Sequence, residues 1–192
     1  PPTNWSSVFG GSAWEWNEAT GEYFLHMFSR RQPDLNWENP AVRAEVFALM
    51  RFWLDKGVDG FRMDVINLIS KRHGPDGHLA DAPVTQPGFL QSGWEMAANG
   101  PRLMEFLQEM KREVLAGRDV LTVGEAPGAT PELARALTDA DSGVMSMLFQ
   151  FEHVGLDQQP GGSKWDLMPL DVVALDQCLG RWQAALADVG WN

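Results

Sequence analysis

The strongest constraint on the fold is an alternation between long amphipathic segments and short apolar segments that end in polar residues. The long segments, each with one apolar stripe at helical spacing, are 40–56, 101–116 and 171–189. The short apolar segments, which predict strands, are 58–65, 119–125 and 144–153. This order predicts a parallel sheet with right-handed crossovers, either doubly wound or part of a (β/α)8 barrel.

The helix boundaries carry the expected end signals. Asn39 is a suitable N-cap and Pro40 suits the first helical position, while Gly57 suits the stop. Thr130 followed by Pro131 repeats the start signal and predicts a further short helix.

The remaining stretches predict less regular structure. Residues 1–39 indicate loops with short strands, and within them 21–29 fits a short strand or one helical turn. Residues 70–100 are rich in Gly, Pro, His and Asp and predict a long loop. A complete barrel takes about 250 residues and eight strands. If the fold is a barrel, the chain therefore holds roughly its middle.

Composition excludes several partners. With 26 acidic and 15 basic residues the net charge is −11, which argues against nucleic acid or an anionic membrane as a partner. Cys178 is the one cysteine, so no intramolecular disulfide or cysteine-based metal site can form, and a cytoplasmic location is favoured. No apolar run approaches the ~20 residues that span a bilayer.

Polar residues close all three predicted strands. The first strand ends with Arg62 and Asp64, the second with Glu125, and the third with Glu152 and His153. The carboxyl ends of parallel strands form the functional edge of such folds. Since neighbouring strands lie about 4.8 Å apart, carboxylates there can approach to roughly 5–5.5 Å, the separation that a retaining glycosidase needs.

The charges suggest different roles for two of these acids. Arg62 and Asp64 flank Met63 and therefore project to the same side of the strand, where the guanidinium would keep Asp64 ionised. Glu125 follows an apolar run without a nearby basic residue, so desolvation would raise its pKa as a proton donor requires.

Other interpretations stay open from spacing alone. Asp64 and Arg62 could form a structural ion pair, and Glu125 could be a capping or loop carboxylate. Glu152 and His153 favour a structural role over a catalytic one. A divalent metal site built from Asp64, Glu125 and His153 is geometrically feasible, but Arg62 would repel the cation.

Tryptophan is unusually frequent, with nine residues in the chain. Those in the first forty residues are Trp5, Trp14, Trp16 and Trp37. They fit either core packing or an aromatic wall against the flat face of a sugar ring.

Several motifs resemble those of glycoside hydrolase family 13, the α-amylase superfamily, in its oligo-1,6-glucosidase and α-glucosidase branch. The matching stretches, in chain order, are FGGSAW (9–14), QPDLNWENPAVR (32–43), GVDGFRMDVINLISK (57–71), LTVGEAPG (121–128) and MLFQFEH (147–153). They cover essentially the whole chain.

The resemblance implies a role for each matched residue. Asp64 would be the nucleophile, Glu125 the general acid/base, and Arg62 the arginine that orients Asp64. Val65 occupies a position where valine goes with a preference for α-1,6 bonds and threonine with α-1,4 bonds. The residues matching the sugar pocket are Phe9, Phe28, Gln32 and Phe151.

The resemblance also implies the organisation of the chain. Residues 1–38 would end a loop domain inserted in the barrel, and residues 39–192 would form the central portion of the (β/α)8 barrel, about strands four to six with their helices. The implied activity is retaining hydrolysis of terminal α-1,6-glucosidic bonds in isomalto-oligosaccharides. The alternatives are an α-1,4-glucosidase, a trehalose-6-phosphate hydrolase, and a non-catalytic carbohydrate-binding or structural fragment.

The family pattern extends beyond these residues. It requires a third carboxylate in an Asn-His-Asp motif on a later strand, whereas this sequence stops at GWN (190–192). We therefore expect these 192 residues alone to be inactive and to self-associate through uncovered edge strands. No cofactor is expected, and any calcium of the parent enzyme would lie outside this chain.

Overall fold

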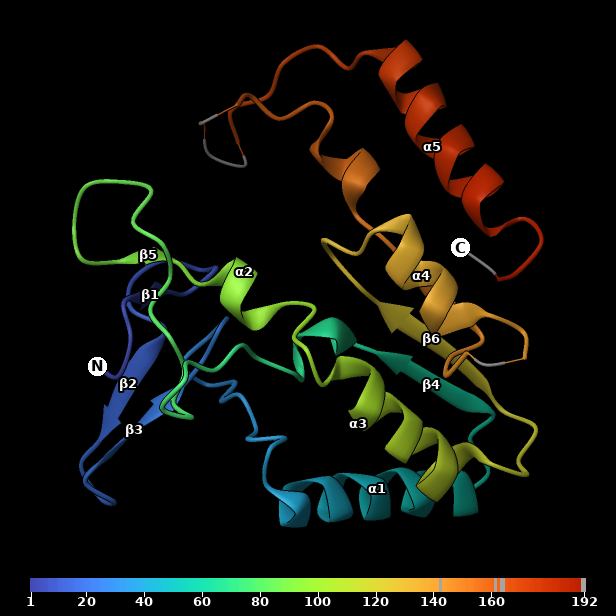
Figure 1. The fold of residues 1–192 in the computed structure, drawn as a ribbon, viewed down its shortest axis with the longest axis horizontal. Helices are drawn as coiled ribbons and strands as arrows, with labels where there is room; N and C mark the ends of the chain where they lie inside the picture. Colours follow the sequence, from blue (N-terminus) through green and yellow to red (C-terminus); the bar gives the residue numbers. More distant parts are fainter. Residues whose placement is uncertain (142, 161, 163–164, 191–192) are drawn as a thin grey trace. The chain divides into compact units, whose positions relative to one another are not determined.

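The structure is a computed structural model, and its fold is shown in Figure 1. The described residues are 1–141, 143–160, 162 and 165–190. Trp191 and Asn192, which end the sequence where the next strand was expected, lie outside them.

The chain divides into two compact units. Unit 1 comprises Pro1–Leu49 and Leu68–Phe106, and unit 2 comprises Met50–Asn67 and Leu107–Asn192. Each unit is built from two separate stretches of chain. The expected boundary between a loop domain and a barrel near residue 38 stays a prediction.

Unit 1 contains the short strands expected near the N-terminus. β1 (Trp5–Ser6) pairs in parallel with β5 (Gln91–Ser92), and β2 (Trp14–Asn17) pairs antiparallel with β3 (Glu22–Leu25). The stretch 21–29 therefore forms a strand at its start and not a helical turn. Trp5 is fully buried, which confirms the core interpretation for this tryptophan.

The prediction of one long loop at 70–100 is wrong in part. This stretch contains strand β5 and the short helix α2 (Trp94–Ala97). The side chain of Gln91 is fully buried and forms hydrogen bonds with backbone groups of the preceding turn. Both elements are too short to produce a sequence period, so only such tertiary contacts reveal them.

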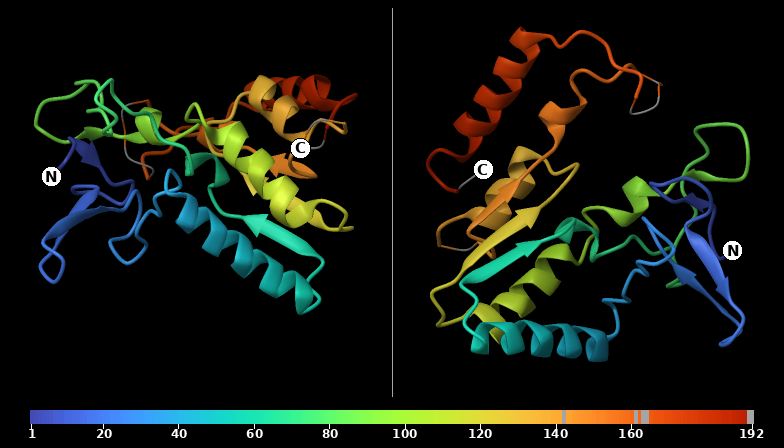
Figure 2. Two further views of the ribbon diagram at one scale, coloured as in Figure 1. Left: turned by 60° about the horizontal axis from the view of Figure 1, so that its bottom comes forward. Right: turned by 180° about the vertical axis from the view of Figure 1, so that it is seen from behind.

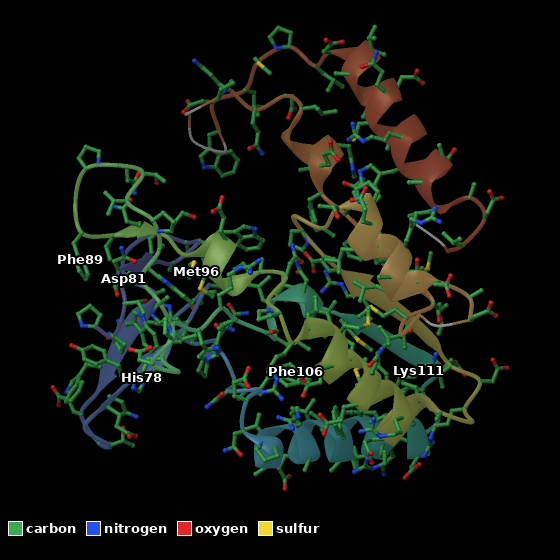
Figure 3. The ribbon with its side chains drawn as sticks, in the orientation of Figure 1. His78, Asp81, Phe89, Met96, Phe106 and Lys111 are labelled. Atoms are coloured by element: carbon green, nitrogen blue, oxygen red, sulfur yellow. The ribbon has the colours of Figure 1, made fainter. Side chains whose placement is uncertain are left out.

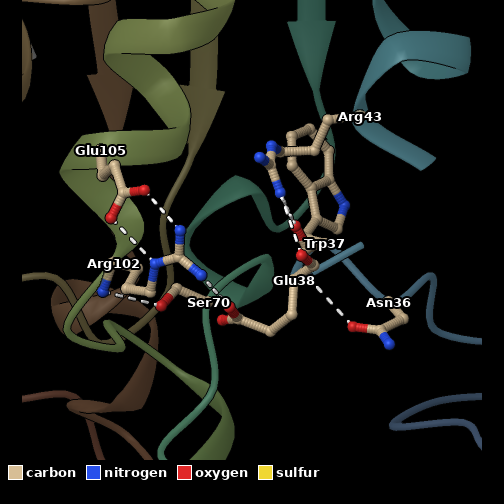
Figure 4. Close-up of polar contacts among 7 residues, drawn as sticks. All are labelled: Asn36, Trp37, Glu38, Arg43, Ser70, Arg102 and Glu105. Carbon is tan, nitrogen blue, oxygen red and sulfur yellow. Dashed lines mark hydrogen bonds and ion pairs between the residues drawn. The ribbon is translucent and has the colours of Figure 1, made fainter. Parts of the chain in front are cut away.

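A cluster around Arg102 connects separate stretches of unit 1 (Figure 4). The Arg102 guanidinium forms ion pairs with Glu38 and Glu105 and lies 4.6 Å from the ring centre of Phe106. Its backbone N–H donates to the hydroxyl of Ser70 at 2.9 Å. These contacts hold the segment that contains Glu38 against the segment that contains Arg102 and Glu105.

Unit 2 contains the parallel sheet. β4 (Gly60–Met63) pairs with β6 (Leu121–Glu125), which pairs with β7 (Met147–Phe149), and both pairings are parallel. Figure 2 shows these strands side by side and pointing in one direction. The predicted parallel arrangement is confirmed.

The third strand is shorter than the predicted 144–153. It ends at Phe149 because the buried side chain of Gln150 accepts a hydrogen bond from the backbone N–H of Glu152. The chain then turns into the 3₁₀ helix η3 (Glu152–Gly155). A side chain that bonds its own backbone in this way ends a strand without any change in hydrophobic pattern.

The helices follow their predicted positions. They are α1 (Pro40–Asp55), α3 (Leu103–Met110), its continuation as a π-helical turn at Lys111–Leu115, α4 (Pro131–Thr138) and α5 (Val172–Leu186). α1 and α3 contribute residues to both units. The last helix ends at Leu186 and not at the predicted Val189.

Specific contacts fix two of these helices. The hydroxyl of Thr130 accepts from the backbone N–H of Leu133, which confirms the predicted cap of α4. α4 packs against β7 and α5. The Lys111 side chain, labelled in Figure 3, donates to the carbonyl oxygen of Gly143 at 2.6 Å and so connects α3 to the segment before β7.

Candidate active site

One arginine contacts both acids at the carboxyl edge of the sheet. Nη1 of Arg62 donates to Oδ1 of Asp64, and Nη2 donates to Oε2 of Glu125. Met63 lies opposite Gly124 in the parallel register, so the next residue of each strand places Asp64 beside Glu125. The structure therefore brings together the three residues that the sequence singled out most strongly.

The two acids differ in their exposure to solvent. The side chain of Glu125 is 12% exposed, whereas that of Asp64 is 68% exposed and that of Arg62 is 49% exposed. Met63 between the latter two is buried. Arg62 and Asp64 form the expected contact at this edge of the sheet, and both side chains are exposed to solvent.

This difference separates the proton affinities of the acids. The hydrogen bond from Arg62, followed by the contact with Glu125, lowers the pKa of Asp64 below its usual value. Burial, followed by the contact with Asp64, raises the pKa of Glu125 above its usual value, against the opposing charge of Arg62. Both directions agree with those expected from the sequence. Compared with ordinary carboxyl groups, the arrangement thus favours the ionised form of Asp64 and the protonated form of Glu125.

The backbone after Asp64 is strained. Val65 has a φ of 35°, a left-handed conformation that β-branched residues rarely adopt. Its backbone N–H contacts Glu125 and partly offsets the raised pKa of that acid. The chain then forms the 3₁₀ helix η1 (Ile66–Leu68).

Two aromatic residues lie beside the acids on β7 and just after it. The ring centre of Phe149 lies 5.5 Å from the guanidinium carbon of Arg62 and 5.8 Å from the ring of Phe151. Phe149 was not singled out from the sequence, where it is one of several apolar strand residues. Only the strand pairing shows that it lies under Arg62.

The other predicted sugar contacts belong to unit 1, whereas Asp64 and Glu125 belong to unit 2. The rings of Phe9 and Phe28 meet edge to face with centres 5.6 Å apart, and Gln32 is exposed. Their roles as substrate contacts stay a prediction.

The polar residues after β7 have structural contacts. Glu152 accepts hydrogen bonds from Arg181 and from Nε1 of Trp182, both on α5, and Arg181 lowers its pKa. His153 contacts the side chain of Gln150. These contacts favour the structural interpretation of the pair.

The metal alternative is not supported by the arrangement of its expected ligands. Arg62 bridges the two carboxyl groups that a cation would need, and His153 is engaged elsewhere. Within the described residues no group of three or more His, Cys, Asp or Glu side chains is arranged to hold a metal ion. The absence of a cofactor stays a prediction.

Neither Asp64 nor Glu125 lines either of two cavities. In unit 2, a cavity of about 860 Å³ is bordered by Lys111, Thr122 and Ser146 near the amino ends of the strands, and neither Asp64 nor Glu125 lines it. In unit 1, a cavity of about 710 Å³ is lined partly by Trp14 and Trp37. Trp14 is half-buried at this cavity, whereas the ring of Trp37 also packs against the buried rings of Phe47 and Phe106, which favours core packing for Trp37.

Parallel strands with helical crossovers, and a pair of acids with opposed pKa shifts at their carboxyl edge, define the class of barrel glycoside hydrolases. The family model described as "Alpha amylase, catalytic domain" matches residues 1–192. The chain therefore belongs to the α-amylase family, and its parallel sheet and helices are part of a (β/α)8 barrel.

The chain is similar to larger bacterial enzymes. It is 54% identical to an oligo-1,6-glucosidase of Parageobacillus thermoglucosidasius and 49% identical to an alpha-glucosidase of Pediococcus pentosaceus, covering 100% of this chain and 33% of each relative. The chain thus spans about one third of the length of these curated relatives.

Solved structures show the same relationship. A trehalose-6-phosphate hydrolase of Bacillus licheniformis matches with a TM-score of 0.86 at 42% identity. An isomaltulose synthase of Klebsiella sp. matches with a TM-score of 0.87 at 35% identity. Each match covers 100% of this chain and 33% of the other. Among the residues that the structure describes, no helix is long and apolar enough to cross a membrane.

Proposed function

We propose that the protein containing these residues is a retaining α-glucosidase that hydrolyses terminal α-1,6-glucosidic bonds of isomalto-oligosaccharides. The main support for this proposal is the contact of Arg62 with both Asp64 and Glu125. The pKa of Asp64 is lowered and that of Glu125 is raised. The α-1,6 preference is supported by relatives named oligo-1,6-glucosidase at 53% to 55% identity.

In the first step the ionised carboxylate of Asp64 attacks the anomeric carbon of the terminal glucose. The bond from that carbon to the glycosidic oxygen breaks as the carboxylic acid of Glu125 donates its proton to the departing oxygen. The shortened sugar leaves, and the glucose is bound covalently to Asp64.

In the second step the ionised Glu125 takes a proton from water as the water oxygen attacks the anomeric carbon. The ester to Asp64 breaks, which releases glucose with its original configuration and returns the proton to Glu125. Arg62 and the backbone N–H of Val65 both favour the anionic form of Glu125 that this step requires. Proton transfer of this kind typically contributes about 10²- to 10⁴-fold to the rate.

The remaining assignments belong to the same proposal. Val65 would contribute to linkage preference, and the aromatic and amide side chains that contact the sugar would be Phe9, Phe28, Gln32 and Phe151. The substrate would be a small neutral oligosaccharide, which suits a chain with a net charge of −11. We place the enzyme in the cytoplasm, without a cofactor within these residues.

The test replaces each acid by its amide in the complete protein. Asp64→Asn should lower hydrolysis of an aryl α-glucoside by several orders of magnitude, because no covalent intermediate can form. Glu125→Gln should lower the rate of hydrolysis most for substrates with poor leaving groups, because departure of such a group depends on protonation of the glycosidic oxygen. Asp55→Asn, which changes an exposed acid paired with Arg118, is the matched control. Unchanged turnover in both test variants, with the thermal transition retained, contradicts the proposal.

A second candidate is a trehalose-6-phosphate hydrolase, which the similar structure from Bacillus licheniformis favours. A phosphorylated substrate needs additional Lys or Arg side chains near the pocket, and the sequence offers no obvious set. Rates on isomaltose, maltose and trehalose-6-phosphate distinguish this candidate from the α-1,6 and α-1,4 activities. Sugar binding without any turnover would instead favour a non-catalytic carbohydrate-binding protein.

A further inference from the structure

Asn67 is a fully buried polar residue in the segment that follows Asp64. It has no exposed surface, and its side-chain Nδ2 donates to the carbonyl oxygen of Pro127 at 2.9 Å. Asn67 lies three residues after Asp64, and Pro127 lies two residues after Glu125. This hydrogen bond therefore connects the segment that carries one acid to the segment that carries the other.

Two backbone hydrogen bonds also position the loop after β6. The N–H of Ala126 donates to the carbonyl oxygen of Phe149 at 3.0 Å, and the N–H of Ala129 returns to Ala126. Pro127 has no N–H, so its hydrogen bonding rests on its carbonyl group. Pro127 itself is half-buried, whereas the donor side chain of Asn67 is fully buried, so loss of this bond would leave the buried amide donor without this acceptor.

Packing within the same segment reinforces the connection. A Cβ added at Gly124 would lie 2.5 Å from Sδ of Met145 and 3.2 Å from Cγ2 of Ile66, so η1 also packs on β6 beside Glu125. Val65, which has a left-handed backbone conformation, forms the turn between Asp64 and Ile66. Asn67 ends the segment and ties it to Pro127.

We propose that Asn67 is a positioning residue that sets the distance between the carboxyl groups of Asp64 and Glu125. The inference rests on the proposed function and deepens it. A retaining mechanism needs the two carboxyl groups about 5–5.5 Å apart. A displacement of about 1 Å in such a site lowers the rate by about 10²-fold. A bond that anchors both segments within three residues of the acids controls that distance.

The test uses Asn67→Leu in the complete protein, because leucine has a similar volume and no donor. At a temperature where the variant is folded, kcat should fall by about 10- to 100-fold with KM nearly unchanged. The pH profile of kcat/KM should also narrow. The contact between the acids lowers the pKa of Asp64 and raises that of Glu125. If this contact is weakened, the acidic limb of the profile moves to higher pH and the basic limb moves to lower pH.

Ser146→Ala provides the matched control. It removes the hydrogen bond that the Ser146 hydroxyl accepts from the backbone N–H of Thr122, near the starts of neighbouring strands, and it keeps the bond from the Ser146 backbone N–H to the Thr122 hydroxyl. The control should lower the thermal transition without changing kcat or the pH profile. If Asn67→Leu does not fold, Asn67→Ser, whose small hydroxyl side chain leaves room for water, supplies the same measurements.

The outcomes separate this inference from the function on which it rests. A folded Asn67 variant with unchanged kcat and pH limbs, or with a raised KM alone, overturns the positioning role. Retained activity in Asp64→Asn and Glu125→Gln overturns the proposed function instead. Loss of activity in those two variants, together with the kcat and pH effects in Asn67→Leu, supports both.

Discussion

At the scale of single residues, one guanidinium serves two acids that need opposite protonation states. The charge of Arg62 favours ionisation of both Asp64 and Glu125. What separates the acids is burial, because Glu125 loses most of its contact with water and Asp64 does not. In the proposed mechanism, desolvation of one carboxyl group thus distinguishes the proton donor from the nucleophile.

Replacing Arg62 by glutamine should move the pH profile of kcat/KM to higher pH. Without the positive charge the pKa of Asp64 rises, so the nucleophile becomes protonated at a higher pH and the acidic limb moves up. The pKa of Glu125 also rises, so the proton donor keeps its proton longer and the basic limb moves up as well. Initial rates on an aryl α-glucoside between pH 4 and 10 measure both limbs.

Arg118→Gln is the control for this change, because it removes the same charge from an exposed pair with Asp55. Its profile should match that of the unmodified protein. A downward shift of either limb in Arg62→Gln, or equal shifts in both variants, would show that Arg62 does not set the proton affinities of the acids.

Residues of the site differ in how far the sequence could reveal them. Arg62 and Asp64 are conspicuous because charges interrupt an apolar run, and the isolation of Glu125 from basic neighbours indicates its raised pKa. Asn67 carries a weaker signal, as a polar residue within the apolar run VINLIS. Phe149 carries none, since its contact with Arg62 depends on the order of strands in the sheet.

At the scale of elements, the close pairing of β4 with β6 depends on a glycine. A Cβ on Gly60 would lie 1.9 Å from the backbone oxygen of Leu121, an atom that cannot move without displacing the strand. Gly60→Ala should therefore destabilise the protein by about 3 kcal/mol, at the upper end of the range for overpacking. Thermal or chemical unfolding measures the change.

Gly180→Ala is the matched substitution with the opposite expected sign. Gly180 lies within α5, and a Cβ there would meet no atom within 4 Å. Alanine should stabilise the helix by about 0.5–1 kcal/mol. Equal stability of the two variants would mean that the approach of Gly60 to Leu121 does not constrain the sheet.

The elements were predictable where their signals are local. α1 and α4 begin at the expected prolines, and the strands of the parallel sheet lie inside the expected apolar runs. β5 and α2 were missed because each spans only about one period of its pattern, too little for a repeat to be recognised. The early end of β7 was missed because it depends on the side chain of Gln150.

At the scale of the whole molecule, the described residues bury the side chain of Glu125 but leave that of Asp64 largely exposed to solvent. The chain spans about a third of its curated relatives, and the side chain of Asp64 is 68% exposed. Ion pairs exposed to solvent are weak, and catalysis by carboxylates is strongest where water is excluded. The remaining two thirds of such an enzyme would have to provide that enclosure.

The isolated chain of 192 residues should therefore hydrolyse no aryl α-glucoside, whereas the longer protein that contains it should be active. Within the described residues, β4 and β7 lie at the edges of the parallel sheet. Uncovered edges of this kind pair with other chains, so the isolated chain should elute from a size-exclusion column as dimers or larger species. The longer protein carrying Asp64→Asn defines the background rate of the assay. Turnover by the isolated chain clearly above that background would show that the two acids and Arg62 suffice without enclosure, and a monomeric elution profile would show that the sheet edges are covered by the chain itself.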